Sequence, residues 1–329
     1  MTTNLAQTGF GRRDWVSGRT LGLVFFASSL ILAMAIVSDS FLTAGTFFSQ
    51  SRYVAFYVLI ALSQAVCLAV GDMNLTVGAV GSITTVALGL CLDPAHAGLP
   101  VWAGVPLALL IGPLIGLTQG LIITRMKIDS FIVSLSLMFV FMGLRSGISG
   151  GSSYRMPESF WWFGQSSIGG WLPFMFVLVL VILAGVAFLY KNTVLGRRLL
   201  ATGSNADASR LSGINTDRMI VTAHVFSGGF AGLAAVLWAS WSANAAPQTG
   251  DDWLIISFAV AIIGGTGLAG SLISAFGILM GAIIFKMIQH SLVILKVNDH
   301  YSNTLLGALI LLAIVVDRAR EHYSERKRI

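Results

Sequence analysis

Three polar residues interrupt one of the most apolar parts of the chain. Asp72, Asn74 and Thr76 lie within AVGDMNLTVGAVG, between two hydrophobic runs and with no true loop to hold them. A carboxylate among apolar residues is costly, and it is retained where it binds an ion, relays a proton or pairs with another group. The alternative is a break in the helices at this point. Gly71 and Gly78 flank the polar residues, and they favour a structural gate over a catalytic carboxylate.

The surroundings of these residues indicate a membrane protein. Of the 329 residues, 56% are hydrophobic and only 10% are charged, whereas about 25% are charged in an ordinary soluble domain. Runs of roughly 20 apolar residues, enough for one helical crossing of a bilayer, follow one another without the alternation of barrel strands. We therefore expect an all-α, polytopic fold with roughly ten transmembrane helices, of which the eighth and tenth are short enough to be broken, tilted or re-entrant. The ten segments are Leu21–Val37, Tyr53–Val70, Leu75–Leu92, Val101–Thr124, Phe131–Ile148, Trp171–Tyr190, Met219–Ala243, Leu254–Gly267, Leu272–Ile294 and Leu305–Val316.

Lysine and arginine residues indicate how these segments are oriented. Positive charge gathers before the first segment, after the fourth, between the sixth and seventh, and after the tenth. By the positive-inside rule, those connections and both termini are cytoplasmic. The expected domains are an N-terminal tail at 1–20, a transmembrane domain at 21–317 with a cytoplasmic loop at 191–218, and a C-terminal tail at 318–329. The basic pI of about 9.6 therefore has a topological explanation, and no nucleic-acid-binding module accompanies it.

The remaining polar residues inside the apolar runs are almost all neutral. Hydroxyls, amides and indoles suit a neutral, hydroxyl-rich solute, while the simpler interpretation of any one of them is an interhelical hydrogen bond worth about 0.6 kcal/mol. Apart from Asp72, the acids lie in tails, loops or the ends of runs, so an ion-driven relay of buried carboxylates is not indicated. The neutral residues, besides Asn74 and Thr76, are Ser63, Gln64, Gln119, Ser134, Ser136, Ser227, Trp238, Trp241, Asn244 and Gln289.

A glycine-rich stretch, AIIGGTGLAGS, lies in the eighth segment. Gly264, Gly265 and Gly267 each raise the helical cost by about 1 kcal/mol relative to alanine, and broken helices are tolerated only when buried in protein or lining a cavity. We expect this stretch to break its span near the middle, beside a pathway or at a tight helix contact. These glycines and the three polar residues of the earlier stretch are the candidates for a translocation pathway or its gate.

The basic loop KNTVLGRRLLATGSNADASRLSGINTDR holds a second candidate site. Asn205 or Ser204 can cap a short helix through Ala206–Leu211, and Gly213 can end it in a left-handed turn. A capped helix outside the membrane suits a docking element for a partner, and it equally suits a solvated helix at the interface.

Motifs for catalysis and for metal binding are missing from the sequence. It contains no G-x-x-x-x-G-K-[ST] phosphate loop, no H-E-x-x-H and no G-x-S-x-G, so we expect no enzyme activity in this chain. The histidines have no ligand spacing, and both cysteines, Cys67 and Cys91, fall within apolar runs, so neither a metal nor a cofactor is expected. Within the runs, His224 and His290 are expected to be packed, hydrogen-bonded residues.

The two halves of the chain share a faint similarity. GDMNL and GDDWL open the third and eighth segments, and glycines four residues apart recur in the fourth and ninth. Five segments separate the partners, so the halves would have opposite orientations in the bilayer, as in the inverted repeats of many transporters.

Four stretches, in the same order, resemble those of one family. GDMNLTVGAVGSITT resembles the GGIDLSVGS signature of the permease subunits of bacterial ABC importers for ribose and related sugars. TVLGRRLLATGSNADASRLSGIN, SGGFAGLAAVL and AIIGGTGLAGS resemble that family's cytoplasmic loop, the following helix and its glycine-rich segment. Two departures touch expected pathway positions: Asn74 replaces the family's acid, which appears earlier as Asp72, and Trp253–Val260 lacks the family's glutamate. Ribose itself is therefore not implied.

The resemblance implies an inner-membrane permease that imports a sugar, polyol or similar neutral polar solute. Its partners would be a second permease copy or a paralogue, cytoplasmic ATP-binding subunits and a periplasmic solute-binding protein. The capped loop would then be a coupling helix that contacts the ATPase, through Gly203, Asn205, Ala208, Arg210 and Gly213. Two other interpretations stay open: an ion-coupled secondary carrier with inverted repeats, and a membrane scaffold without transport activity.

Overall fold

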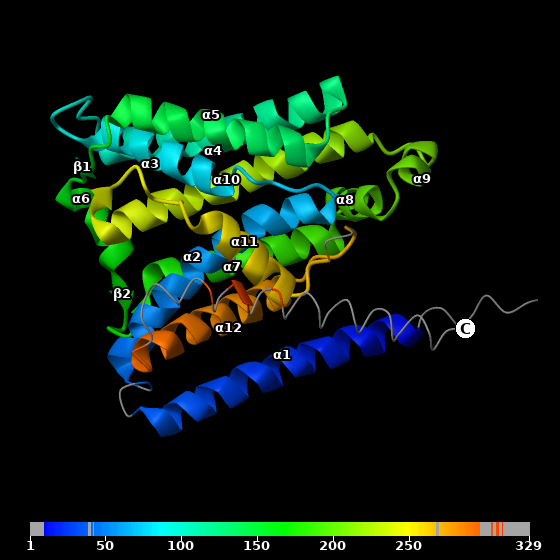
Figure 1. The fold of residues 1–329 in the computed structure, drawn as a ribbon, viewed down its shortest axis with the longest axis horizontal. Coiled ribbons are helices and arrows are strands. Elements are labelled where there is room, and N and C mark those ends of the chain that lie inside the picture. Colours follow the sequence, from blue (N-terminus) through cyan, green and yellow to red (C-terminus); the bar gives the residue numbers. More distant parts are fainter. Residues whose placement is uncertain are drawn as a thin grey trace, which may run out of the picture.

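The computed structural model is a bundle of helices that lie side by side along its longest axis (Figure 1). It describes residues 10–38, 41, 43–267 and 270–296, together with positions 304, 307, 308 and 311. The helices are α1 (Phe10–Val37), α2 (Ala44–Ala69), α3 (Val77–Leu92), α4 (Val101–Met126), α5 (Ser130–Ser149), α6 (Glu158–Gln165), α7 (Phe174–Asn192), α8 (Val194–Ser204), α9 (Ala206–Leu211), α10 (Thr216–Ser242), α11 (Trp253–Ile263) and α12 (Ala275–Ile294). The strands β1 (Tyr154–Arg155) and β4 (Asn244–Ala245) pair antiparallel, as do β2 (Ser167–Ile168) and β3 (Leu172–Pro173).

The predicted all-α, polytopic class is confirmed. Within the described residues, six helices are long and apolar enough to cross a bilayer, namely α2, α4, α5, α7, α10 and α12. Three shorter apolar helices are Leu21–Val37 within α1, α3 and α11. These nine helices coincide with the first nine predicted segments. Of the tenth, Leu305–Val316, only positions 307, 308 and 311 are described, and the predicted C-terminal tail lies outside the described residues.

One helix extends beyond its predicted segment, and one prediction about a helix break fails. Helix α1 begins at Phe10, so it extends from the first predicted segment, Leu21–Val37, into the stretch 1–20. The prediction that glycines break the eighth span near its middle was wrong, because α11 ends at Ile263 and the glycine stretch follows it. The Gly264 N–H still bonds to the carbonyl of Val260 at 2.9 Å. Gly265 then takes a φ of +88°, a left-handed conformation that ends helices.

Helices α3 and α11 begin inside the bundle and run in opposite directions. We call the two ends of the bundle the α9 end and the α6 end, at the right and left of Figure 1. Segment 70–76 starts at the α9 end, and α3 runs from it to the α6 end, where Gly89 packs against Tyr154 of β1. Segment 246–252 starts at the α6 end, after β4, and α11 runs back toward the α9 end. The 11 residues of α11 cover about 16 Å, roughly half of a hydrocarbon core.

The starts of these two helices meet at Gly78 and Gly250. A side chain on either glycine would collide with the carbonyl oxygen of the other. Gly250 also has a φ of +99°, which an L-residue rarely adopts. Trp253, 1% exposed, covers Gly81 at the same place. The two GD stretches thus open discontinuous helices of opposite direction that touch, as an inverted repeat requires.

Glycines also bring the long helices close together. Gly112 of α4 packs against Gly228 of α10 so tightly that a side chain on either would strike the other's backbone. Gly277 of α12 packs in the same way against Gly264, directly after α11. Small residues at such contacts let helix backbones approach closely in membranes. The similar glycine patterns of α4 and α12 therefore make contacts with different partners, α10 and the end of α11.

Candidate functional site

A buried network of neutral side chains joins segment 70–76 to α2, α4 and α10. Asn74 donates from Nδ2 to Ser227 Oγ at 2.8 Å, and Ser227 Oγ lies 3.0 Å from Ser63 Oγ. Gln119 donates from Nε2 to Asn74 Oδ1 at 3.2 Å. The Thr76 hydroxyl lies 2.6 Å from Asn74 Oδ1 and 2.9 Å from Gln119 Oε1, and its single proton bonds to one of them at a time. All five residues are at most 2% exposed. The network therefore stabilises an unwound segment that an apolar interior alone does not tolerate.

Asp72 belongs to a second cluster, beside this network. Its Oδ2 lies 3.1 Å from His224 Nε2, and His224 Nδ1 lies 3.6 Å from Cys67 Sγ. His224 and Cys67 are fully buried, so no solute reaches the thiol in this conformation. The prediction that His224 is a packed, hydrogen-bonded residue is confirmed. Asp72 and Asn74 do not cap α3. The N-cap residue is Thr76, and its side chain accepts no hydrogen bond from the first turn of the helix.

The glycine candidates lie apart from the polar ones, at the α9 end. Gly264 is held against the backbone of Gly277, Gly265 forms the turn, and Gly267 lies near Gly270. The structure therefore divides the six pathway candidates into two groups. The link between them is the end of α2, because the Ser271 N–H donates to the Ala69 carbonyl at 3.1 Å.

The predicted capped helix is present as α9. Asn205 is its cap and accepts from the Ala208 N–H at 2.9 Å, and Gly213 follows with a φ of +81°. Arg210 donates from Nε to the Thr216 hydroxyl at 2.7 Å and from Nη2 to Asp217 at 3.1 Å. These bonds attach α9 to the start of α10.

Gly203 connects this loop to the rest of the bundle. A side chain at Gly203 would collide with the carbonyl of Ala69, and its Cβ position is 3.0 Å from the Ser271 nitrogen. Gly71 and Gly270 also lie against Gly203. The end of α8 is therefore packed onto both the start of segment 70–76 and the glycine stretch, with no space for independent movement.

Sequence reasoning missed how segment 246–252 is held. Arg145 of α5, 9% exposed, donates from Nη1 to the Pro247 carbonyl at 2.7 Å and pairs with Asp251. The sequence signal for this anchor was a cation inside an apolar run.

Gln119 and Ser227 stand out in the sequence only as neutral polar residues. Their hydrogen bonds to Asn74 bring them into one site. Gln64 is fully buried, and its amide has no hydrogen-bond partner in the described part of the chain.

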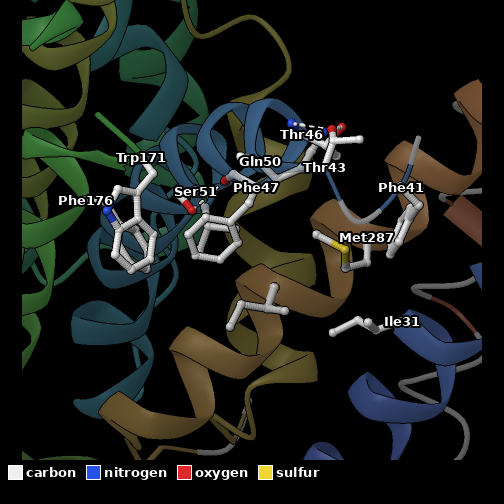
Figure 2. A pocket seen from close by; sticks show the side chains of 13 residues that line it. Ile31, Phe41, Thr43, Thr46, Phe47, Gln50, Ser51, Trp171, Phe176 and Met287 are labelled. Atoms are coloured by element: carbon white, nitrogen blue, oxygen red, sulfur yellow. Dashed lines mark hydrogen bonds between the residues drawn. The ribbon is translucent and has the colours of Figure 1, made fainter. Parts of the chain in front are cut away.

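A cavity of about 600 Å³ lies elsewhere, between α1, α2, α7 and α12 (Figure 2). Figure 2 shows Trp171 and Phe176 at one end of it and Phe41 and Ile31 at the other. Gln50, one of the polar residues in its lining, lies about 20 Å along α2 from Ser63 of the buried network. The lining is mostly apolar, so the cavity suits a hydrocarbon chain better than a hydroxyl-rich solute.

Helices long enough to cross a bilayer, two opposed discontinuities and a buried polar network are features of transporters with inverted repeats. A family described as "Branched-chain amino acid transport system / permease component" matches residues 46–314. The chain therefore belongs to this permease family.

Curated relatives cover nearly the whole chain. The ribose import permease protein RbsC of Escherichia coli K12 is 28% identical over 98% of this chain and 100% of its own length. The L-arabinose ABC transporter permease protein AraH of Azospirillum brasilense is 28% identical, covering 94% of this chain and 90% of the relative. The galactose/methyl galactoside import permease protein MglC of E. coli K12 is 27% identical, covering 93% and 96%. No solved structure gives a significant match.

Proposed function

We propose that the chain is the membrane-spanning subunit of an ATP-driven importer that brings a sugar, polyol or similar neutral polar solute into the bacterial cytoplasm. The end-to-end match to the ribose import permease carries this proposal. The site supports it, because the five-residue network around Asn74 consists of hydroxyls and amides. Asp72 is held by His224, which leaves no free carboxylate there to drive ion coupling.

The α9 end is the cytoplasmic side in this proposal, and both termini lie there. Arg125 and Lys191 lie in the last turns of α4 and α7, Lys127 follows α4, and Arg210 lies in α9. All four are at that end (Figure 1), in agreement with the positive-inside rule. Cytoplasmic ATP-binding subunits dock at the α9 end, and a periplasmic solute-binding protein docks at the α6 end. A second copy of the chain, or a paralogue, completes the transmembrane part.

Coupling follows from the contacts of Gly203. The ATP-binding subunit presses on the loop at Asn205, Ala208, Arg210 and Gly213, and α9 passes the displacement to α8. Since Gly203 is packed against Ala69 and Gly270, a shift of α8 moves segment 70–76 and the glycine stretch together. In this mechanism Asp72, Asn74 and Thr76 form the gate on the cytoplasmic side. Gly264, Gly265 and Gly267 let α11 and α12 follow the movement.

Reconstitution in proteoliposomes tests the function. The permease with its ATP-binding and solute-binding partners should take up radiolabelled ribose, arabinose, galactose or fructose only when ATP is supplied. Uptake by the permease alone, driven by a Na⁺ or H⁺ gradient, would establish the ion-coupled carrier instead.

Two changes in the loop test the coupling role. Deletion of Ala206–Leu211, or Gly213→Trp, should leave the permease inserted and folded but uncouple ATP hydrolysis from solute uptake. Gly170 is a matched control for backbone strain, since its φ is +80° and, as at Gly213, a side chain there meets nothing within 4 Å. Gly170→Trp should therefore lower the melting temperature as much as Gly213→Trp does. Solute-stimulated hydrolysis still coupled to uptake in the loop variants would refute the assignment.

A further inference from the structure

An aromatic cluster with one cation joins α2, α10 and α12, away from the network around Asn74. We call Tyr53, Trp238, Trp241 and Lys286 the aromatic patch. The ring centroids of Tyr53 and Trp241 are 5.3 Å apart, and those of Trp238 and Trp241 are 5.2 Å apart. Lys286 Nζ lies 3.8 Å from the centroid of the Tyr53 ring, which is the geometry of a cation–π contact. Four side chains from three helices thus form one surface.

The patch has a buried back and a partly exposed front. Phe56 and Trp253 are 0% and 1% exposed and pack behind Trp238, with centroids 4.9 and 6.4 Å from it. All four members of the patch are partly exposed. The rings are therefore fixed from behind while one side stays accessible.

The patch lies on the α6 side of the bundle. Tyr53 is nine residues from the α6 end of α2, and Lys286 is eight residues from the same end of α12. Tyr53 follows Arg52 and opens the second predicted apolar run, whereas Lys286 lies inside the ninth. The patch therefore lies near the α6-side edge of the hydrocarbon core.

The patch is rich in hydrogen-bond donors, and the Tyr53 hydroxyl oxygen is the one acceptor among its four side chains. In the part of the chain that the structure describes, Lys286 makes no ion pair, and no hydrogen bond involves Lys286 Nζ, the Tyr53 hydroxyl or the indole nitrogens of Trp238 and Trp241. Lipid chains cannot satisfy such donors, and a cation inside an apolar run is a sign of function. A polar occupant rich in hydrogen-bond acceptors therefore suits this surface.

We propose that the aromatic patch is a solute subsite on the α6 side of the Gly78–Gly250 contact, and that it takes a polyhydroxylated ring such as a monosaccharide. The flat faces of Trp238 and Trp241 contact the C–H face of the ring, while Lys286 and the indole N–H groups donate to its hydroxyl oxygens. Without solute, Lys286 rests on the Tyr53 ring. Each contact is weak, which suits a subsite that must release its solute. The assignment of a sugar as the ligand rests on the proposed function. The prediction that the patch is accessible to polar molecules is independent of it.

Uptake in the reconstituted importer tests the sugar assignment. Lys286→Met and Trp241→Leu should lower ATP-driven uptake of the transported sugar about tenfold, which corresponds to the loss of one such contact. Lys286→Arg, which keeps charge and donors, should retain most of the uptake. Trp102→Leu, a change at a tryptophan 80% exposed on α4, is the matched control. Uptake within a factor of about two of wild type in folded Lys286→Met and Trp241→Leu would overturn the subsite.

Cysteine labelling tests the exposure of the patch without any transport. In a background with Cys67→Ala and Cys91→Ala, Lys286→Cys and Trp238→Cys should react with a charged, water-soluble thiosulfonate in nanodiscs. Val181→Cys is the matched control, because Val181 is 65% exposed and lies about 10 Å inside the α6 end of α7, facing lipid. Cysteines at 286 and 238 that react no faster than the one at 181 would overturn the patch as a polar surface. Fast labelling combined with no sugar uptake by wild type would instead refute the sugar importer and leave a polar subsite for another solute.

Discussion

Segments 70–76 and 246–252 both carry the chain to the middle of the bundle without helix, from opposite ends, yet the surrounding protein holds them differently. The first is fixed by the side-chain network of Asn74 and Thr76 and by the bond between Asp72 and His224. The second is anchored by one arginine, Arg145, through Pro247 and Asp251. The side chains that hold the first segment are thus mostly buried and neutral, whereas one arginine supplies both the hydrogen bond and the ion pair that hold the second.

Burial differs between the polar residues of the two segments. Asn74 and Thr76 are 2% and 0% exposed, whereas Gln248 and Asp251 are exposed, next to the buried Pro247, Thr249 and Gly250. Segments with few buried polar contacts open at lower free energy than those held by a packed network. We therefore expect segment 246–252 to open more easily than segment 70–76, the proposed gate. Segment 70–76 is also the one packed against Gly203, where the force of the proposed ATP-binding partner would be applied.

Filling the contact between the two segments with a side chain should lower the free energy of unfolding the most. In Gly78→Leu the new side chain meets the carbonyl of Gly250, which is backbone and cannot rotate away. We expect the free energy of unfolding to fall by about 3 kcal/mol or more, the upper range for overpacking, with poor recovery of folded protein. Thermal unfolding of the purified permease in detergent measures the change.

Gly185→Leu is the control for that variant, because Gly185 lies in α7 and a Cβ added there would meet nothing within 4 Å. It should unfold within about 0.5 kcal/mol of wild type. If Gly78→Leu is as stable as Gly185→Leu, the two segments do not meet as described.

Removing Asn74 from the centre of the network should lower the free energy of unfolding by less. This change should also show that segment 70–76 is held more firmly than segment 246–252. Asn74→Leu deprives Ser227, Thr76 and Gln119 of a partner, and at about 0.6 kcal/mol per bond the loss is about 2 kcal/mol. Gln248→Leu, in the exposed part of the other segment, should cost less than about 0.5 kcal/mol. Equal losses at the two positions would show that the first segment is no more firmly held than the second.

Much of this architecture could be predicted from the sequence. Apolar runs of bilayer length predicted nine described helices, and the spacing from Asn205 to Gly213 predicted α9. Such predictions succeed because helix formation and capping depend on residues close together in the chain. The faint GDMNL and GDDWL pair likewise predicted two halves of opposite orientation.

The partners of the polar residues could not be predicted. Asn74 is 153 positions from Ser227, Asp72 is 152 from His224, and Arg145 is 102 from Pro247, so only the packing of the helices brings them together. The prediction that the glycine stretch breaks the eighth span near its middle failed for a related reason. Gly264 is costly within a helix, but the close approach of Gly277 requires it, and that contact is invisible in the local sequence.

The ion pair of the second segment offers the finest test of the comparison. A double-mutant cycle with Arg145→Met and Asp251→Asn should give a coupling energy of about 0.5 to 1 kcal/mol, because the Asp251 side chain is 45% exposed and such pairs are weak. In about 1 M salt the coupling should fall, since the exposed Asp251 carboxylate is open to counterions and the screening length is about 3 Å. The matching cycle with Asp72→Asn and His224→Asn should keep its coupling in salt, because the His224 side chain is 0% exposed. Equal salt sensitivity in the two cycles would mean that water reaches both segments alike, which would contradict the difference in how they are held.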